Sequence, residues 1–272
     1  MRVNMHTHSV FCDGKDTPEE MVNEAIRQGF EILGFSSHGH SPYDECSMSP
    51  EATLDYIREI NRLKEAYKDQ ITIYLGIEED KTCRISSKDP YDFVIGSVHF
   101  VEKDGTFMSV DYSEEMMEQI LKEFYHGSFL CYARAYYSEV TELAEAEEVD
   151  IIGHLDLLMK YNDKEKWIRF DDPEYLEIAR ACIDAIGDRK IYEVNTGAMA
   201  RGYRTMPYPH RTLLAYMKEK NLRLMLNSDC HDKTKLTCGY ELSLRLLKEA
   251  GFTELWILKN GRFQPADINL FH

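Results

Sequence analysis

The chain has few basic residues for its number of acidic ones. Its 272 residues include 32 Lys and Arg against 48 Asp and Glu, which gives a formal net charge of −16 at pH 7. Proteins that bind nucleic acid or anionic membranes need clustered positive charge. We therefore expect neither nucleic acid nor a membrane surface as a partner. An anionic small substrate is still compatible with this charge, because bound metal cations dominate the field of a site.

The cysteines lack the pattern of a disulfide framework. They number seven, an odd count, and no two form a Cys-x-x-Cys pair, so a thiolate zinc site is not expected either. The sequence also lacks an apolar run of 18 residues, and its first residues, Met-Arg-Val-Asn, carry no apolar signal segment. We expect reduced thiols, a cytoplasmic location and no membrane span. The oligomeric state is left open.

What the sequence does contain is a regular alternation of strand-length apolar runs and amphipathic helical patterns. Strands are predicted near 2–6, 31–37, 71–77, 92–98, 149–154, 190–195, 223–228 and 254–259. Helices are predicted near 18–28, 51–68, 113–147, 172–187, 208–220 and 239–250. This alternation predicts an α/β fold with a parallel sheet and right-handed crossovers. Because no linker, repeat or low-complexity segment interrupts it, we expect residues 1–272 to form one domain.

Metal-ligand residues follow the apolar runs. His6 and His8 lie two residues apart at the end of the first run, so a strand would direct both imidazoles to one side. Asp229 and His231 repeat this spacing after the run 224–226. Four further residues of ligand type end other apolar runs: His38, Glu78, His99 and His154.

These ligand positions decide between an open sheet and a closed barrel. Side chains at the carboxyl ends of six or seven strands meet only if the strands surround one axis. In an open sheet each step between strands adds about 4.8 Å, which would separate the first ligands from the last. We therefore predict a barrel of about seven strands. Imidazole and carboxylate ligands without thiolate suit zinc, iron or manganese, so we expect a metal-dependent enzyme.

The segment 71–78 illustrates how strand alternation selects a ligand. Ile71, Ile73, Leu75 and Ile77 share one face, and the residues between them share the other. Glu78 is then expected to face the barrel interior, with Gly76 leaving room for the cluster. Glu79 is expected to point away, toward helices or solvent.

Two other positions keep alternatives open. His38 follows the run 34–37 directly, so we prefer it to His40, for which we expect contact with the substrate or support of a ligand. Asp13 precedes Gly14 and is either a ligand or a turn aspartate, since Asp-Gly is a common turn pair. His210 lacks the strand-end pattern and is expected on the surface or on a helix.

Six motifs together resemble the PHP superfamily of metallophosphoesterases. They are His6-Thr7-His8, Ser37-His38, Gly76-Ile77-Glu78, Gly96-Ser97-Val98-His99-Phe100, Ile152-Gly153-His154-Leu155-Asp156 and Asn227-Ser228-Asp229-Cys230-His231. Four further segments are similar to the PHP-type histidinol-phosphate phosphatases: Tyr136-Tyr137, Asp150 to Leu157, Lys160-Tyr161-Asn162 and Glu193-Val194-Asn195-Thr196-Gly197. The resemblance covers nearly the whole chain, in order.

This resemblance implies a distorted (β/α)7 barrel, related to the TIM barrel, that holds a trinuclear metal centre. It assigns one metal to His6, His8, Glu78 and Asp229. It assigns a second to Glu78, as a bridge, with His99 and His154. It assigns a third to Asp13, His38 and His231. The chain departs from the family at Ser37, where members often carry an acidic residue.

The resemblance also implies an activity, the hydrolysis of L-histidinol phosphate to L-histidinol and phosphate in histidine biosynthesis. A hydroxide that bridges two metals would attack the phosphorus. Asp229 or His231 is expected to carry the proton to the leaving alcohol. Arg201, Arg204 and Lys160 are the candidate cations for the phosphate, because arginine in particular pairs with two phosphate oxygens. An acidic residue near the mouth is expected to receive the substrate's ammonium group, but the sequence does not single one out.

Two other functions stay open at this stage. The first is a PHP phosphoesterase for another small phosphomonoester or for a nucleotide. The second is a metal-binding domain without catalysis, which is less favoured because no ligand of the family pattern is missing. In each case two or three divalent transition metals are the expected cofactors.

Overall fold

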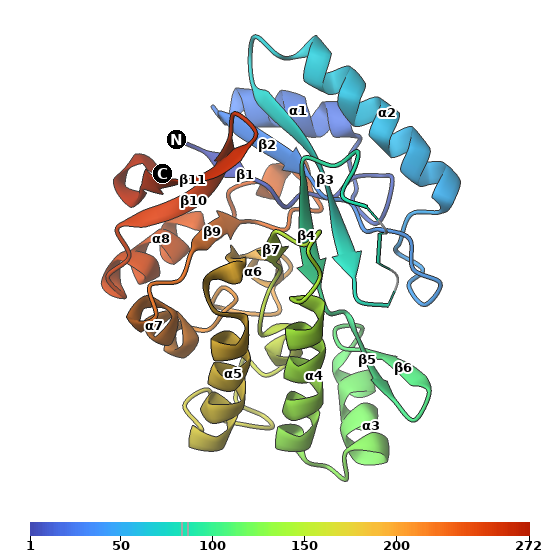
Figure 1. Ribbon diagram of the computed structural model, residues 1–272, viewed down its shortest axis with the longest axis vertical. Helices are drawn as coiled ribbons and strands as arrows, with labels where there is room; N and C mark the ends of the chain where they lie inside the picture. The colour runs from blue at the N-terminus through green and yellow to red at the C-terminus, as the bar shows by residue number, and fades with distance from the viewer. Residues whose placement is uncertain (83, 86) are drawn as a thin grey trace.

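The computed structural model describes residues 1–82, 84–85 and 87–272. Within these residues, seven parallel strands form the main sheet, which runs in the order β1, β2, β3, β4, β7, β8 and β9. The strands are β1 (Val3–Asn4), β2 (Ile32–Phe35), β3 (Thr72–Asp80), β4 (Phe93–Ser97), β7 (Ile151–Ile152), β8 (Ile191–Asn195) and β9 (Leu224–Asn227). Figure 1 shows them gathered at the centre of the molecule, with helices around them.

The sheet curls until its first and last strands meet. Thr7 and Cys230, just beyond β1 and β9, form a parallel bridge. The backbone N–H of His8 donates to the carbonyl of Cys230 at 2.8 Å, and that of Cys230 donates to the carbonyl of His6 at 3.1 Å. The result is a nearly closed seven-stranded barrel, which confirms the predicted fold class. Closure of the barrel places His6 and His8, which follow β1, beside the segment of Asp229 and His231, which follows β9.

The helices that cover the barrel are α1 (Pro18–Arg27), α2 (Pro50–Ala66), α3 (Glu114–Phe124), α4 (Phe129–Leu143), α5 (Pro173–Ile186), α6 (Gly197–Ala200), α7 (Arg211–Glu219) and α8 (Tyr240–Glu249). α1 begins as its sequence indicates, because Thr17 and Glu20 form a reciprocal capping box ahead of Pro18. It ends before Gly29, which has a φ of +76°. Residues with a side chain rarely adopt this left-handed conformation, so glycine is common just after a helix. In Figure 1, α1 and α2 lie at one end of the view and α4 and α5 at the other.

Buried apolar side chains fill the space between the barrel and its helices in two clusters. The smaller cluster lies under α1 and α2 and includes Met21, Leu33 and Tyr56, each with no exposed area. The larger cluster joins the rest of the barrel to the other helices. In the described part of the chain, no helix is both long and apolar enough to cross a membrane. The cysteines described there are all free, while Cys83 lies outside the described residues.

Two regions differ from the sequence prediction. The helix expected over 113–147 is interrupted between α3 and α4, where His126 and Gly127 adopt left-handed conformations with φ of 54° and 76°. The N–H of Gly127 donates to the carbonyl of Leu121 at 2.8 Å and so closes the end of α3. The segment that precedes α3 forms an unpredicted antiparallel hairpin of β5 (Phe100–Lys103) and β6 (Thr106–Ser109).

The predicted strand over 254–259 forms, but outside the barrel. It is β10 (Glu254–Lys259), which pairs antiparallel with β11 (Arg262–Asp267) in a hairpin of its own. In the described part of the chain, the two end strands of the sheet, β1 and β9, approach each other through the bridge between Thr7 and Cys230, and β10 pairs with β11 instead.

Candidate metal centre

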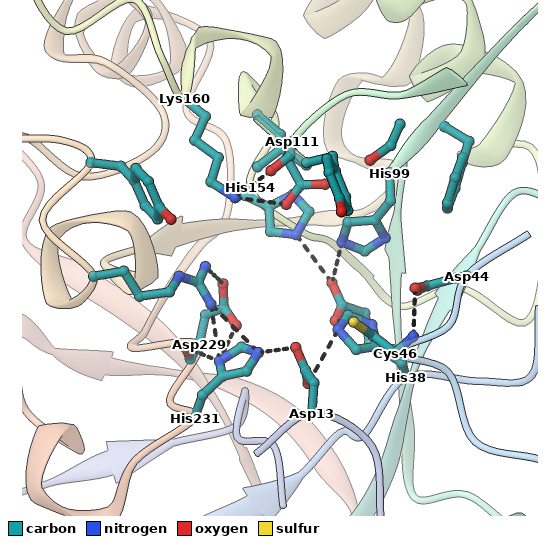
Figure 2. Close-up of a pocket in the computed structure, with 17 residues that line it drawn as sticks. Asp13, His38, Asp44, Cys46, His99, Asp111, His154, Lys160, Asp229 and His231 are labelled. Atoms are coloured by element: carbon teal, nitrogen blue, oxygen red, sulfur yellow. Dashed lines mark hydrogen bonds and ion pairs between the residues drawn. The ribbon is translucent and has the colours of Figure 1, made fainter. Parts of the chain in front are cut away.

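All nine candidate ligands named from the sequence lie together at the carboxyl ends of the barrel strands. His6 and His8 follow β1, His38 follows β2, His99 follows β4, His154 follows β7, and Asp229 and His231 follow β9. Glu78 lies within β3, and Asp13 lies in the loop between β1 and α1. The donor atoms of eight of them form three groups with spacings of at most 4.8 Å: His8, Asp13, His38 and His231; His6, His8 and Asp229; and His38, Glu78 and His99. The ninth, His154, lies 3.1 Å from Glu78. Figure 2 shows several of these side chains directed into one pocket.

Glu78 is the centre of this arrangement. Its Oε2 lies 3.2 Å from Nε2 of His6, 3.4 Å from Nε2 of His8 and 3.1 Å from Nδ1 of His38. Burial by itself raises the pKa of this carboxyl, but the surrounding imidazoles outweigh burial and hold the pKa well below its usual range. Glu78 is therefore a carboxylate inside the barrel.

The second oxygen of Glu78 contacts the ligands of the neighbouring strands. Oε1 lies 3.1 Å from Nε2 of His154 and 3.5 Å from Nε2 of His99. Ser97 on β4 donates its hydroxyl to the same oxygen at 2.6 Å. One carboxylate thus touches five histidines that come from four strand ends, as a bridging ligand would.

The opposite side of the cluster is built by Asp229, His231 and Asp13. Oδ1 of Asp229 lies 3.2 Å from Nε2 of His8, and Oδ2 of Asp13 lies 3.1 Å from Nε2 of His231. Asp229 has a φ of +48°, an uncommon conformation that turns its carboxylate into the cluster. Gly197 makes room for it, since a Cβ there would lie 2.5 Å from Oδ2 of Asp229.

The donor set and its unpaired atoms fit divalent cations. Nε2 of His6, Nε2 of His8 and Oε2 of Glu78 are buried, and none has a hydrogen-bond partner among the described residues. Buried polar atoms without partners are costly, and here they point at one another. Bonds to metal ions would satisfy them, and imidazole nitrogens with carboxylate oxygens are ligands that zinc, iron and manganese share.

Two acidic residues that the sequence interpretation did not name as functional orient these ligands. Glu193 on β8 accepts from Nδ1 of His6 at 2.7 Å and from the backbone N–H of His154 at 2.9 Å. Asp80 on β3 accepts from the backbone N–H of His99 at 2.7 Å, and its Oδ2 lies 3.4 Å from Nδ1 of the same histidine. Such outer hydrogen bonds fix the tautomer and direction of a metal-binding histidine. The two-residue period that places Glu78 in the interior also places Asp80 there, so the sequence did contain this signal.

A pocket opens onto the cluster. Its volume is about 270 Å³, which is near the lower end for small-ligand sites. Beyond the metal-ligand candidates, its walls contain Asp44, Cys46, Phe100, Ser109, Asp111, Tyr112, Leu157, Lys160, Arg201 and Tyr203.

Arg201 is the cation on the pocket wall that faces the cluster. Its Nη2 donates to Oδ2 of Asp229 at 3.2 Å, and its Nη1 lies 3.0 Å from Nδ1 of His231. Burial opposes the charge of the guanidinium, but Asp229, Asp111 and Asp13 raise its pKa. It therefore stays charged beside the metal-ligand candidates.

The other candidate cations and His40 lie differently from the expectation. Arg204 does not line the pocket: its side chain is fully buried, 3.8 Å from Oδ2 of Asp156 and over the ring of Tyr208. His40 is exposed, does not line the pocket, and Nδ1 bonds to the carbonyl of Met48 at 3.1 Å. Neither side chain therefore reaches the pocket wall, because the loops after β8 and β2 turn both away from it. Lys160 does line the pocket, but its ammonium group already donates to the backbone carbonyl of Asp111 at 2.7 Å and to its Oδ2 at 3.0 Å.

Two expectations for β3 also need correction. Glu79 points away from the cluster, as predicted, but it is buried rather than exposed to solvent. It is only 1% exposed and accepts from the N–H of Ile85 at 2.8 Å, and burial raises its pKa to about 8. The space beside Gly76 does not serve the cluster, because the ring of Phe93 fills it, 2.2 Å from where a Cβ would stand.

Comparisons with known proteins agree with this geometry. A family model described as PHP domain matches residues 4–197. A histidinol-phosphatase of Bacillus subtilis is 26% identical over 88% of this chain and 97% of its own length. A histidinol phosphate phosphatase of Lactococcus lactis, solved with zinc, L-histidinol and phosphate, is 25% identical, with a TM-score of 0.71 and coverage of 97% and 98%. A Listeria monocytogenes structure at 24% identity shares the fold, with a TM-score of 0.78 over 89% of this chain and 99% of that one.

Proposed function

The chain belongs to the PHP domain family, and we propose on that basis that it is a metal-dependent phosphatase that hydrolyses L-histidinol phosphate to L-histidinol and phosphate. The observation that carries the proposal is the contact of one carboxylate, Glu78, with five histidines at the floor of a small pocket. The choice of substrate follows the relatives, which are histidinol-phosphatases and align with nearly the whole chain. The proposed reaction is then a step of histidine biosynthesis.

Two or three divalent transition metals are the proposed cofactors. His6, His8 and Asp229 would hold one ion, Glu78 with His99 and His154 a second, and Asp13 with His38 and His231 a third. The close spacing of the donor atoms supports this assignment. His8 and His38 each belong to two of the three groups, and Glu78 contacts a histidine proposed for each of the three ions. When bound, such metals polarise a phosphoryl oxygen and lower the pKa of water to near neutrality.

The chain's own cation for the substrate is Arg201. Its guanidinium lies at the edge of the cluster, 3.2 Å from Asp229, and offers two parallel N–H donors to phosphoryl oxygens. Charge that develops on the equatorial oxygens would be stabilised there, as in other phosphoryl-transfer sites. In the proposed complex Arg201 orients the phosphoryl group and holds its charge.

The leaving alcohol oxygen needs a proton, because an aliphatic alkoxide is a strong base. Asp229 and His231 are the two groups beside Arg201 that would relay it, by taking up the proton that the attacking water loses and passing it to the leaving oxygen. Oδ2 of Asp229 faces the guanidinium, and Nδ1 of His231 lies 3.0 Å from the backbone carbonyl of Asp229. With Nδ1 donating to that carbonyl, Nε2 is the ring nitrogen of His231 that faces Asp13 and the pocket.

The test is a substrate panel with the metal-replete protein. Phosphate release would be measured for L-histidinol phosphate, p-nitrophenyl phosphate, a nucleoside monophosphate and bis(p-nitrophenyl) phosphate. We expect the highest kcat/KM for L-histidinol phosphate. A higher value for another compound would make this a phosphoesterase of different specificity, and no release from any of them would make it a metal-binding domain without catalysis.

A further inference from the structure

A loop and a hairpin that are far apart in the chain meet at the pocket wall. The loop, residues 42–47, lies between β2 and α2 and contributes Asp44 and Cys46 to the lining. The β5–β6 hairpin contributes Phe100 and Ser109. Figure 2 shows Asp44 and Cys46 together at one side of the pocket. The shape of this side therefore depends on how the loop is held against the hairpin.

Tyr43 of the loop stacks on Phe107 of β6. The ring centres lie 4.1 Å apart, and the ring planes differ by 24°. This is the shortest distance between ring centres among the described pairs of phenylalanine, tyrosine and tryptophan. Tyr43 is nevertheless 47% exposed, and neither ring lines the pocket. The stack thus joins two parts of the wall without itself facing the ligand space.

The hairpin is the anchored partner of this contact. Val101 and Met108 are buried in the larger apolar cluster, and strand alternation places Phe107 on the face of β6 opposite Met108. Just after β6, the backbone N–H of Val110 donates to the carbonyl of His99 at 2.8 Å. This bond fixes the end of the hairpin beside a metal-ligand candidate. Phe107 therefore presents its ring from an anchored strand.

The 42–47 loop forms its hydrogen bonds within its own turn. Ser47 donates its hydroxyl to the carbonyls of Ser41 and Asp44, at 3.0 and 2.7 Å. The backbone N–H of Cys46 donates to Oδ1 of Asp44 at 2.9 Å. Among the described residues, no hydrogen bond or ion pair joins residues 42–47 to a distant segment. The aromatic stack is the contact that ties this turn to the hairpin.

We propose that the stack of Tyr43 on Phe107 fixes the width of the pocket and so sets the largest alcohol group that the site accepts. Asp44 and Cys46 follow Tyr43 directly in the turn, so a shift of this loop moves the wall that they form. The pocket is small, about 270 Å³, and leaves room for a compact alcohol only while the loop is in place. Tyr43 and Phe107 are positioning residues for this wall. The inference rests on the proposed phosphatase activity, but not on L-histidinol phosphate as the substrate.

The size of the effect follows from the population of the displaced loop. A bulky ester binds only while the loop is displaced, so its kcat/KM is proportional to that population. A compact ester binds with the loop in either position. Loss of an aromatic pair changes an equilibrium by about two- to tenfold. Removal of one ring should therefore favour the bulky ester over the compact one by about this factor.

The experiment compares phenyl phosphate with biphenyl-4-yl phosphate, using the metal-loaded full chain. The two leaving phenols have similar acidity, so the esters differ mainly in size. The wild type should prefer phenyl phosphate. Tyr43→Ala should raise the ratio of kcat/KM for the biphenyl ester over that for the phenyl ester by about two- to tenfold. If turnover is slow, the matching phosphonates, measured as competitive inhibitors of phosphate release from L-histidinol phosphate, give the same ratio.

Further variants separate the stack from a general effect of mutation. Phe107→Ala removes the other ring and should raise the ratio equally. The double variant should add little, because both substitutions break one contact. Tyr43→Phe keeps the ring and should keep the wild-type ratio. Thr106→Ala is the matched control, since Thr106 is exposed on the same strand and does not line the pocket.

Four outcomes would overturn the role of the stack: an unchanged ratio in Tyr43→Ala, an equal loss on both esters, additive changes in the double variant, or a wild type that accepts both esters equally. A wild type that hydrolyses the aryl esters but not L-histidinol phosphate would contradict the proposed substrate, and the ratio would still decide the role of the stack. A wild type that hydrolyses no phosphate ester and binds neither phosphonate would contradict both.

Discussion

Nδ1 of His6 lies 2.7 Å from Oε1 of Glu193, and neither side chain has any exposed area. The hydrogen bond leaves the lone pair of Nε2 directed at Glu78, 3.2 Å away. A buried carboxylate that orients a ligand histidine typically contributes about ten- to a hundredfold to metal affinity.

Glu193→Gln should therefore weaken metal binding while the fold is retained. We expect the metal concentration for half-maximal activity to rise by about ten- to a hundredfold. Titration of the metal-stripped protein with Zn²⁺ or Mn²⁺, followed by phosphate release, measures this shift. Activity should recover at high metal concentration. An unchanged titration curve would show that Glu193 does not support the metal centre.

Mutation should affect activity at Arg201 and stability at Arg204, although the two residues are only three positions apart. Arg201→Met removes the cation that faces the cluster and should lower kcat/KM for L-histidinol phosphate by about ten- to a hundredfold, with little change in stability. Arg204→Met leaves Asp156 as an uncompensated buried charge and should cost about 3–5 kcal/mol in the free energy of unfolding. Steady-state kinetics and urea unfolding separate the two effects. A large kinetic effect confined to Arg204→Met would reverse the assignment.

Gly197→Ala should damage the site more than the fold. The added methyl would stand 2.5 Å from Oδ2 of Asp229 and push this carboxylate out of the cluster. We expect a loss of bound metal and of phosphate release. Gly29→Ala is the control, because Gly29 has a φ of +76° and nothing near its missing Cβ. It should cost about 1 kcal/mol of stability without a change in activity. Full metal content in Gly197→Ala would contradict this account.

His210 should make the protein less stable in weak acid. The ring is stacked on Phe170, and burial together with Arg204 and Arg211 lowers its pKa from 6.5 to about 4. The unfolded chain then binds a proton that the folded chain does not between pH 6.5 and 4. The stabilisation is therefore complete above pH 6.5 and is lost as the pH falls through this window.

His210→Asn keeps a side chain suited to the first turn of α7 but cannot titrate. The difference in unfolding free energy between the wild type and this variant should change by at most about 1.4 kcal/mol for each pH unit in that window. Urea unfolding at pH 7, 5.5 and 4.5 measures it. Parallel curves for the two proteins would mean that His210 keeps its ordinary pKa when folded.

The barrel was predictable because the apolar runs that form its strands recur at regular intervals and end on ligand residues. Strand alternation also identified Glu78 and rejected Glu79. The break between α3 and α4 was missed because helical periodicity continues on both sides of Gly127. The sequence left open whether β10 joins the barrel, because an apolar run does not reveal which sheet a strand joins.

Two site residues that the sequence prediction did not name, Glu193 and Asp111, contact partners that are distant in the chain. Glu193 is 187 residues from the His6 that it orients, and Asp111 is 49 residues from Lys160. Neither relationship leaves a periodic signal. The sequence also could not show which of Arg201 and Arg204 lines the pocket, because both belong to the same loop. Only the folded structure shows that Arg201 does.

The most direct test of the bridging role of Glu78 is its replacement by glutamine. Elemental analysis and phosphate release from L-histidinol phosphate would be measured on the same preparations of wild type and Glu78→Gln. We predict two or three transition metals per chain in the wild type, and in the variant a loss of bound metal together with loss of turnover. A variant that keeps the wild-type metal content and rate would contradict the assignment of a shared metal centre around Glu78.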